Sequence, residues 1–326
     1  MPIHCKQLIL ILVLLCSCQL SLADNTLRIG ILKFGTVNWE LDVIKNWQLD
    51  KQAKITIEII PYASKQATLV AFQSGTVDII VADWIWVSRQ RHEDNNFTFI
   101  PYSCALGAIM VPQASPIKDI PDLINKRLGV AGGALDKSWL MLRSYTQALH
   151  NFDMLTELSP QYAAPPLLNG QIMHNKIDAV LNFWHYSARL QAQGYRRIHS
   201  MQDTITSLLG YQVQLPMLGY VFNRTHAEHN ISLYQGFADA IQDARQIMLT
   251  DNQEWQRLRP IMKVADDNTF NLLREGYRKG IPTKWSTLER ASASIIYSIL
   301  ADTGGKKLVG DHAQLAPGTF WEHVTF

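Results

Sequence analysis

Phe72-Gln-Ser-Gly-Thr-Val-Asp-Ile-Ile-Val-Ala-Asp-Trp84 and, 100 residues later, Ile172-Met-His-Asn-Lys-Ile-Asp-Ala-Val-Leu-Asn-Phe-Trp184 align without a gap. In each copy a helix end meets Gly75 or Asn175, residue types that adopt the left-handed backbone which closes a helix. The apolar run that follows is typical of a parallel strand buried on both faces. The repeat predicts two similar α/β lobes whose strand ends face a shared cleft. Chance similarity between two helix–strand units is the alternative.

The first 23 residues have the features of an export signal rather than of the fold. Lys6 precedes the apolar stretch 8–15, which is too short to span a bilayer, and Ser21-Leu-Ala23 supplies the small residues that precede a cleavage site. We therefore expect a soluble, exported mature chain that begins at Asp24. A competing cleavage site at Leu15-Cys-Ser-Cys18 would instead leave Cys18 lipid-anchored.

Composition excludes several classes of protein. A formal charge of +2 with 18% charged residues gives no basic stripe, which argues against nucleic-acid binding. Of the four cysteines only Cys104 lies beyond the leader, so a chain cleaved there has neither a disulfide nor a thiol-rich metal site. A mature chain of about 300 residues exceeds what one core usually holds, which again favours two lobes.

Strand and helix patterns alternate through the first two thirds of the chain, and helical patterns fill the rest. Strands are expected at 27–34, 55–60 (ending at Pro61), 127–131, 177–183 and 196–199, with crossings between the lobes at 97–111 and 217–222. Helices are expected at 39–47, 64–74, 117–125, 135–150, 233–249, 255–261, 269–278 and 287–300. This order predicts an α/β fold with a helical C-terminal segment.

Several of these segments together resemble a known family. They are Leu27-Arg-Ile-Gly30, the Gly-Thr-Val-Asp turn at 75–78, Lys126-Arg-Leu-Gly-Val130 and the Ile177-Asp-Ala-Val strand. In this order they are similar to bacterial ABC-transporter periplasmic solute-binding proteins of the nitrate/sulfonate/taurine type, a group that includes binders of thiamine-pyrimidine precursors. The likeness covers roughly 27–300. The loop 33–39 departs from it, because it lacks the proline common there in relatives, and this leaves the ligand open.

The resemblance implies a type II periplasmic-binding-protein fold with a central cleft. Lobe I would consist of residues 24–104 and 220–326, and lobe II of residues 105–219. It also implies a periplasmic monomer without a cofactor, which captures a small organic solute by clamshell closure. The solute would then pass to an ABC permease and its ATPase at the inner membrane.

Candidate ligand-binding residues lie in the loops that follow the expected strands. Open α/β sheets bind ligands at the carboxyl ends of their strands, and helix N-termini offer free N–H groups to anions. The candidates are Phe34, Gly35, Asn38, Trp39, Ser64, Lys65, Asp83, Trp84, Trp86, Gly133, Lys137, Ser138, Trp139, Asn182, Trp184 and His185.

The chemistry of these candidates is mixed. Five of the nine tryptophans fall among them, and a flat ring favours a heterocycle or an amine, although core packing is the alternative for any one Trp. Asp83 also favours an amine, whereas the lysines and helix starts favour an acid. For Ser64 and Ser138 the alternative is ordinary helix capping. We expect a small organic ligand with an aromatic or heterocyclic part.

Catalytic motifs are absent from the sequence, so we expect a binding protein rather than an enzyme. The chain has no Gly-x-Ser-x-Gly, phosphate loop or dinucleotide fingerprint. His226 and His229 have no identifiable third metal ligand, and the cysteine cluster of the yeast-type pyrimidine synthases that share this fold is missing. The alternative function is an exported accessory protein acting on a periplasmic quinoprotein-type dehydrogenase, or in metal-chelate or cofactor handling.

Overall fold

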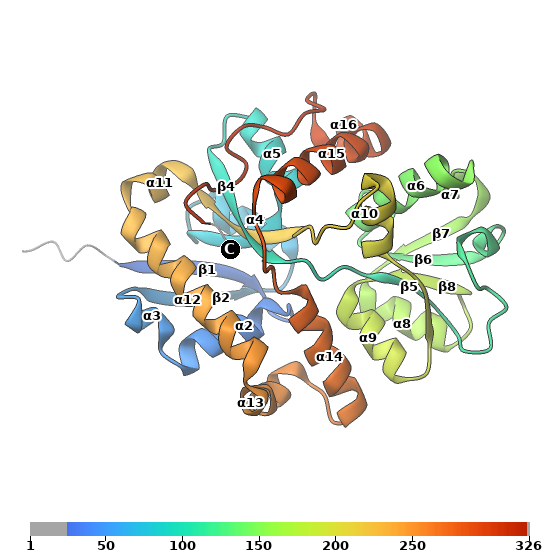
Figure 1. The fold of residues 1–326 in the computed structure, drawn as a ribbon, viewed down its shortest axis with the longest axis horizontal. Helices are drawn as coiled ribbons and strands as arrows, with labels where there is room; N and C mark the ends of the chain where they lie inside the picture. The colour runs from blue at the N-terminus through green and yellow to red at the C-terminus, as the bar shows by residue number, and fades with distance from the viewer. Residues whose placement is uncertain (1–24, 325–326) are drawn as a thin grey trace, which may run out of the picture.

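The computed structural model describes residues 25–324, so the predicted leader lies outside the described residues. Within that range the chain forms two mixed five-stranded sheets with helices around them (Figure 1). Sheet one has the strand order β2-β1-β3-β10-β4. Its strands are β1 (Thr26–Leu32), β2 (Thr56–Tyr62), β3 (Ile79–Asp83), β4 (Phe97–Ser103) and β10 (Leu218–Asn223).

Sheet two repeats this arrangement with the order β7-β6-β8-β5-β9. In each sheet a central strand, β1 or β6, pairs in parallel with two others, and an antiparallel strand, β10 or β5, joins the fifth. The strands are β5 (Ala108–Val111), β6 (Arg127–Ala131), β7 (Ser159–Ala163), β8 (Ala179–Asn182) and β9 (Arg196–Ser200). The expected α/β class and two-part architecture are confirmed.

About half of the chain is helical. Helices between the strands are α2 (Val37–Asn46), α3 (Leu49–Gln52), α4 (Lys65–Gln73), α5 (Trp84–His92), the 3₁₀ helix η1 (Ile120–Leu123), α6 (Lys137–His150), α7 (Met154–Glu157), α8 (Pro165–Met173), α9 (Trp184–Ala192) and α10 (Met201–Leu209). The C-terminal helices are α11 (Arg224–His229), α12 (Ile231–Thr250), α13 (Asn252–Met262), α14 (Asp267–Gly280), α15 (Thr287–Gly304) and α16 (Lys306–Val309). No helix in residues 25–324 combines the length and apolarity needed to span a membrane.

The aligned sequence units occupy equivalent places in the two sheets. Gly75 and Asn175 both have positive φ, +73° and +55°, and both end a helix as expected. Each following Asp then binds the first residues of the neighbouring strand. Asp78 accepts from the backbone N–H of Arg28 at 2.8 Å and pairs with its guanidinium at 2.7 Å. Asp178 binds Arg127 with the same two distances.

Three details differ from the predicted elements. β2 continues through Pro61 to Tyr62, because β2 is the edge strand of sheet one and a proline there costs no ladder hydrogen bond on the open side. The expected run 97–111 divides at 104–107 into β4 and β5, which belong to different sheets. The edge strand β7 and the helix α10 have no counterpart in the prediction.

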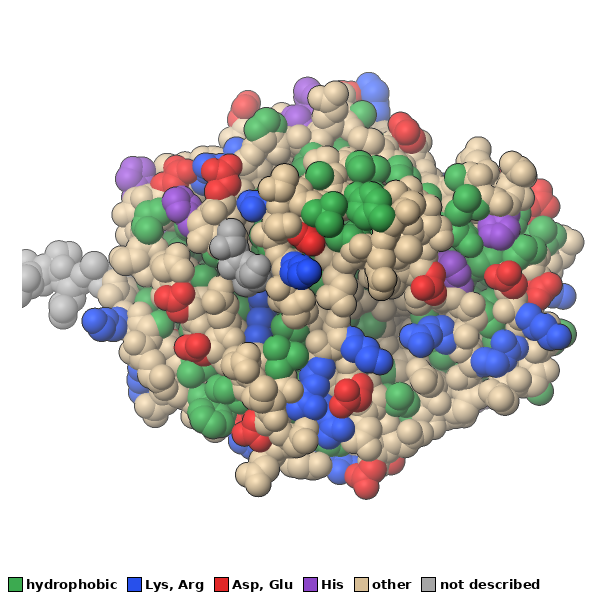
Figure 2. Space-filling view, viewed as in Figure 1, with side chains coloured by type: hydrophobic (Ala, Val, Ile, Leu, Met, Phe, Trp, Pro, Cys, Tyr) green, Lys and Arg blue, Asp and Glu red, His purple; other side chains and the backbone are tan. Residues whose placement is uncertain are grey.

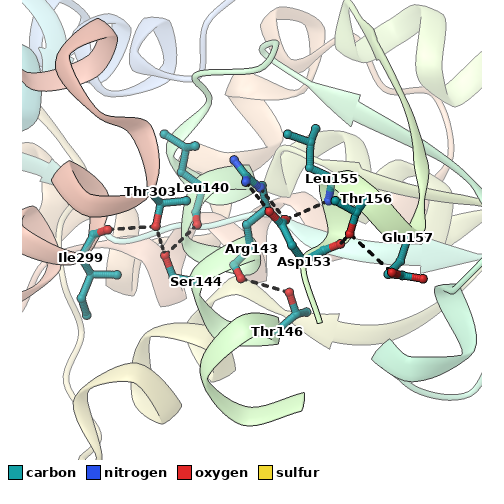
Figure 3. Close-up of polar contacts among 10 residues, drawn as sticks. All are labelled: Leu140, Arg143, Ser144, Thr146, Asp153, Leu155, Thr156, Glu157, Ile299 and Thr303. Atoms are coloured by element: carbon teal, nitrogen blue, oxygen red, sulfur yellow. Dashed lines mark hydrogen bonds and ion pairs between the residues drawn. The ribbon is translucent and has the colours of Figure 1, made fainter. Parts of the chain in front are cut away.

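Helix α15 connects the two halves of the molecule. One apolar core contains Ile80 of sheet one, Val130 of sheet two and Leu300 of α15. Figure 3 shows a polar contact beside it, where the hydroxyl of Ser144 on α6 meets that of Thr303 on α15. The predicted lobe boundaries stay a prediction, but the core shows that the two halves are in apolar contact.

A buried ion pair holds the helices on sheet one. Arg245 of α12 lies 3.2 Å from Glu40 of α2, and the two side chains are 4% and 1% exposed. The hydroxyls of Tyr220 and Tyr277 donate to the same carboxylate at 2.7 and 3.1 Å. The Glu40 carboxylate therefore has a full set of donors, as a buried charge requires.

Candidate functional site

An ion pair joins the strand ends of the two sheets. Asp83, the last residue of β3, lies 2.9 Å from the ammonium of Lys137 and 3.3 Å from that of Lys65. Lys137 is the first residue of α6, which follows β6 of sheet two, whereas Lys65 begins α4 on the other side. The structure therefore brings three predicted site residues together across the boundary between the sheets.

Both members of this pair are charged at neutral pH. Burial by itself raises the pKa of Asp83, but the positive charges of Lys137 and Lys65 outweigh it and hold that pKa well below its ordinary value. Burial lowers the pKa of Lys137, and the Asp83 charge more than reverses this, so the Lys137 pKa is raised. The Lys65 side chain is 54% exposed and that of Lys137 24%, so both remain accessible to a ligand.

Carboxylates of the chain itself occupy the helix N-termini at this boundary. Asp83 accepts from the N–H of Trp86 at 2.9 Å, and Asp136 accepts from those of Ser138 and Trp139 at 3.0 and 3.3 Å. Gly132 has φ +87°, and a Cβ there would lie 2.6 Å from the Asp136 carboxylate, so only glycine allows this close approach. An anion arriving at either helix would compete with a resident carboxylate.

Asp136 and two of the candidates, Ser64 and Gly133, serve the local structure around these helix starts. Burial raises the pKa of Asp136, which leaves its carboxylate easier to protonate than an exposed one. The Ser64 hydroxyl accepts a hydrogen bond from the N–H of Ala67 at 3.2 Å. This is the helix-capping role that was the alternative to ligand binding for Ser64. Gly133, at φ +96°, has open space where a Cβ would lie.

Two predicted tryptophans meet between the sheets. The rings of Trp39, on α2, and Trp184, on α9, lie edge to face with centroids 6.1 Å apart. Trp255 and Tyr277 complete the cluster around Trp39. Trp184 is half-buried, so part of its ring remains open to a ligand. A Cβ on Gly276 of α14 would lie 2.9 Å from Trp184, so the ring also rests directly on that helix.

The other three predicted tryptophans pack in the core. Trp84 and Trp139 are both 0% exposed, and the Trp84 indole N–H donates to the carbonyl of Pro216 at 2.9 Å. Trp86 is partly buried and stacks on Phe97 with a centroid distance of 5.7 Å. In this structure these rings take the core-packing role that was the alternative for each Trp, and Trp84 and Trp139 offer a ligand no surface.

The remaining candidates either shape loops or lie apart from the ion pair. Phe34 is 68% exposed and carries the Lys263 ammonium 4.5 Å from its ring centre, while Asn38 donates to the carbonyls of Leu32 and Gly35 within its own loop.

Asn182 and His185 lie at the end of β8 and the start of α9. The Asn182 amide donates to Pro165 and Asn169 at 3.0 and 2.8 Å, which makes it structural. Burial lowers the pKa of His185 to about 4, so its ring is neutral at physiological pH. The histidines His226 and His229 bind other partners, namely the hydroxyl of Tyr234 for His226 and the carbonyl of Thr225 for His229.

A cavity of about 380 Å³ lies beside Trp184, where chain segments cross between the sheets. Helices α9 and α14, which pack against each other, form its walls, and the crossing segment 104–108 forms its floor. Lys and Arg side chains gather across the lower middle of the face drawn in Figure 2, over α14 and the adjoining part of the other half. Sequence reasoning missed this cavity, because its two cations, Arg197 and Lys279, lie far apart in the chain and outside any motif.

Solved structures with the same fold include periplasmic binding proteins. The aliphatic sulphonate binding protein SsuA from Escherichia coli aligns with 18% identity over 91% of this chain and 92% of its own, with a TM-score of 0.73. The alkanesulfonate-binding SsuA from Xanthomonas axonopodis pv. citri, bound to MOPS, aligns with 16% identity over 91% and 98% and a TM-score of 0.68. The ligand binding component of a Staphylococcus aureus ABC-type import system, with zinc bound, gives 13% identity, 91% and 96% coverage and a TM-score of 0.67.

These likenesses establish the fold, and a family model establishes the family. No curated protein sequence matches the chain closely enough to count as a relative. The model described as "NMT1/THI5 like" matches residues 51–255, which is more than half of the chain. This match confirms the resemblance to solute-binding proteins and thiamine-pyrimidine-precursor binders. The chain belongs to the NMT1/THI5-like family.

Proposed function

We propose that this protein is the periplasmic solute-binding subunit of an ABC importer, which binds a small organic anion between its two sheets. The observation that carries the proposal is the contact between strand ends of different sheets, through Asp83 with Lys137 and through Trp39 with Trp184. Both contacts lie where ligands bind in open α/β sheets. The predicted lobes, 24–104 with 220–326 and 105–219, would be the two moving bodies.

Opening the cleft exposes a site with two cations and one aromatic face. When the lobes separate, Lys137 loses Asp83 as a partner and becomes available to an acidic group, which Lys65 reaches from the other side. The exposed part of Trp184 offers stacking to the rest of the ligand. A ligand that contacts both lobes favours the closed form by its extra contacts there, and the permease would recognise that form.

Acidic ligands are favoured over amines because the carboxylates at the site, Asp83 and Asp136, already have partners within the protein. Asp83 is bound by two lysines and an N–H group, and Asp136 by two N–H groups. Lys65, in contrast, is half exposed and makes one contact of 3.3 Å. Two of the structural neighbours are sulfonate-binding proteins, which supports a sulfonate or carboxylate ligand.

Thermal unfolding against a ligand panel tests the proposal. The panel would contain alkanesulfonates, MOPS, taurine, nitrate, carboxylates, pyrimidines, amines, quinone cofactors and metal chelates. A ligand at 100 times its Kd adds about 2.7 kcal/mol, or roughly 5–10 °C in Tm at 2–4 °C per kcal/mol. Lys65→Met and Trp184→Ala should reduce the shift, whereas Lys51→Met, an exposed lysine on α3, should not. A panel with no response would favour the accessory-protein alternative instead.

A further inference from the structure

The cavity between α9 and α14 is built by both halves of the molecule. Leu273 and Tyr277 on the inner side of α14 pack in the apolar core with α2 and α12. Ala108 and Met110 of β5, which form part of the cavity floor, belong to sheet two. At about 380 Å³ the cavity is within the size range of small-molecule sites. It is separate from the Asp83–Lys137 pair, none of whose residues lines it.

Two cations without partners stand at this cavity. Among residues 25–324, neither Lys279 of α14 nor Arg197 of β9 has a side-chain hydrogen bond or ion pair. Glu275, the carboxylate at the same cavity, is held by Arg274 at 3.0 Å and by Arg278 at 3.7 Å. The net charge around the cavity is therefore positive, and each half of the molecule contributes one cation.

The rest of the lining determines what kind of anion would fit. The inner surface is mostly apolar, and amides complete it. Its apolar members include Leu106, Ala108, Met110, Trp184 and Ala188, and its amides are Gln191, Gln202 and Gln214. An acidic head group would meet the two cations, and an apolar tail would cover the floor. We propose that this cavity is a second ligand site, for a small anion with an apolar tail, which shares Trp184 with the proposed cleft site but neither of its lysines.

A ligand in this site would also act on the arrangement of the two sheets. Its head group would link Lys279 to Arg197, and its tail would lie against Trp184, whose ring already rests on Gly276. Such a ligand gains its contacts only while α9 is packed on α14. By linkage, a ligand in the cavity therefore favours the packing of α9 on α14. It also favours binding of any cleft ligand that requires the same arrangement of the two sheets.

Methyl NMR of the full protein, labelled with [methyl-¹³C]methionine, tests the proposal. Met110 lines the cavity, and Met173 on α8 lies outside its lining. Hexanoate is the probe, and hexanamide, which has the same tail without the charge, is its matched control. We expect hexanoate to shift the Met110 resonance saturably and leave Met173 unmoved. Hexanamide should bind at least about tenfold more weakly, because it lacks charge-assisted bonds.

Variants separate this site from the cleft. The double variant Lys279→Gln/Arg197→Gln changes two exposed side chains and should weaken hexanoate binding at least about tenfold, with the other methionine resonances unchanged. Lys65→Met, in the cleft, should leave the Met110 titration as it is. The proposal is overturned if Met110 does not respond, if hexanamide binds equally well, or if the double variant binds like the native protein. It is also overturned if Lys65→Met removes the response, since hexanoate would then act from the cleft.

Discussion

Replacing Asp83 by Asn removes the charge that joins the two sheets and keeps the cap on α5. Asn is as good an N-cap as Asp, so the N–H of Trp86 retains its acceptor. What is lost is the 2.9 Å contact with Lys137 and the weaker one with Lys65. Asp83→Ala would lose the cap as well, at a further cost of about 1 kcal/mol.

The size of the effect follows from the geometry of the pair. A hydrogen bond to a charged group contributes about 1.5–3 kcal/mol, and an exposed ion pair about 0–1 kcal/mol. The Asp83 side chain is 5% exposed, but that of Lys137 is 24% exposed and can recover water when its partner is lost. We therefore expect a coupling free energy of about 1–2 kcal/mol between the two residues.

A double-mutant cycle of Asp83→Asn and Lys137→Met, measured by urea unfolding near neutral pH, isolates this coupling. The pKa of Asp83 is lowered from 3.8, so its contribution is present above that value and is lost as pH falls through the lower pKa of the folded state. The pKa of Lys137 is raised from 10.5, so its contribution is lost only as pH rises above that value. The coupling free energy should thus be independent of pH between 3.8 and 10.5. A coupling below about 0.5 kcal/mol at neutral pH would refute the reasoning.

Two further substitutions test the packing around the site. Glu40→Gln should destabilise the protein by about 3–5 kcal/mol, because it removes the carboxylate charge that balances the buried Arg245 guanidinium, and urea unfolding measures the change. Gly276→Ala places a Cβ 2.9 Å from Trp184 and should loosen the contact between α14 and α9, visible as a change in tryptophan fluorescence. Gly170→Ala, also within a helix but with open space around the new Cβ, should leave the fluorescence unchanged.

Local sequence patterns were sufficient to predict the repeated framework. The aligned units end helices at Gly75 and Asn175, because the residues that determine a helix end lie within a few positions of one another. The contacts of Asp78 with Arg28 and of Asp178 with Arg127 join residues 50 and 51 positions apart, so they depend on the pairing of strands and were not predicted. The strand β7 escaped prediction because Ser-Pro-Gln-Tyr-Ala has neither β-branched residues nor alternation. It forms an edge strand only because β6 offers it a partner.

The sequence predicts on which elements the candidate residues lie but not which of them are accessible, as two aligned residues show. Trp84 and Trp184 occupy the same position of the repeat, yet one is fully buried and the other half-buried. Trp84 is covered by Tyr297 of α15 and by Phe320, both more than 200 residues later in the chain. Local pattern places a side chain on an element, but a distant segment decides whether it stays accessible.

The position of β10 in sheet one sets the order in which the molecule can be completed during synthesis. β10 lies between β3 and β4, which are not neighbours without it. Residues 218–223 leave the ribosome after every strand of sheet two has been made. Until then β3 and β4 each lack a partner on one side, and the N-terminal hundred residues remain an unfinished sheet. The part of the chain that is made first is therefore completed only after sheet two has been made.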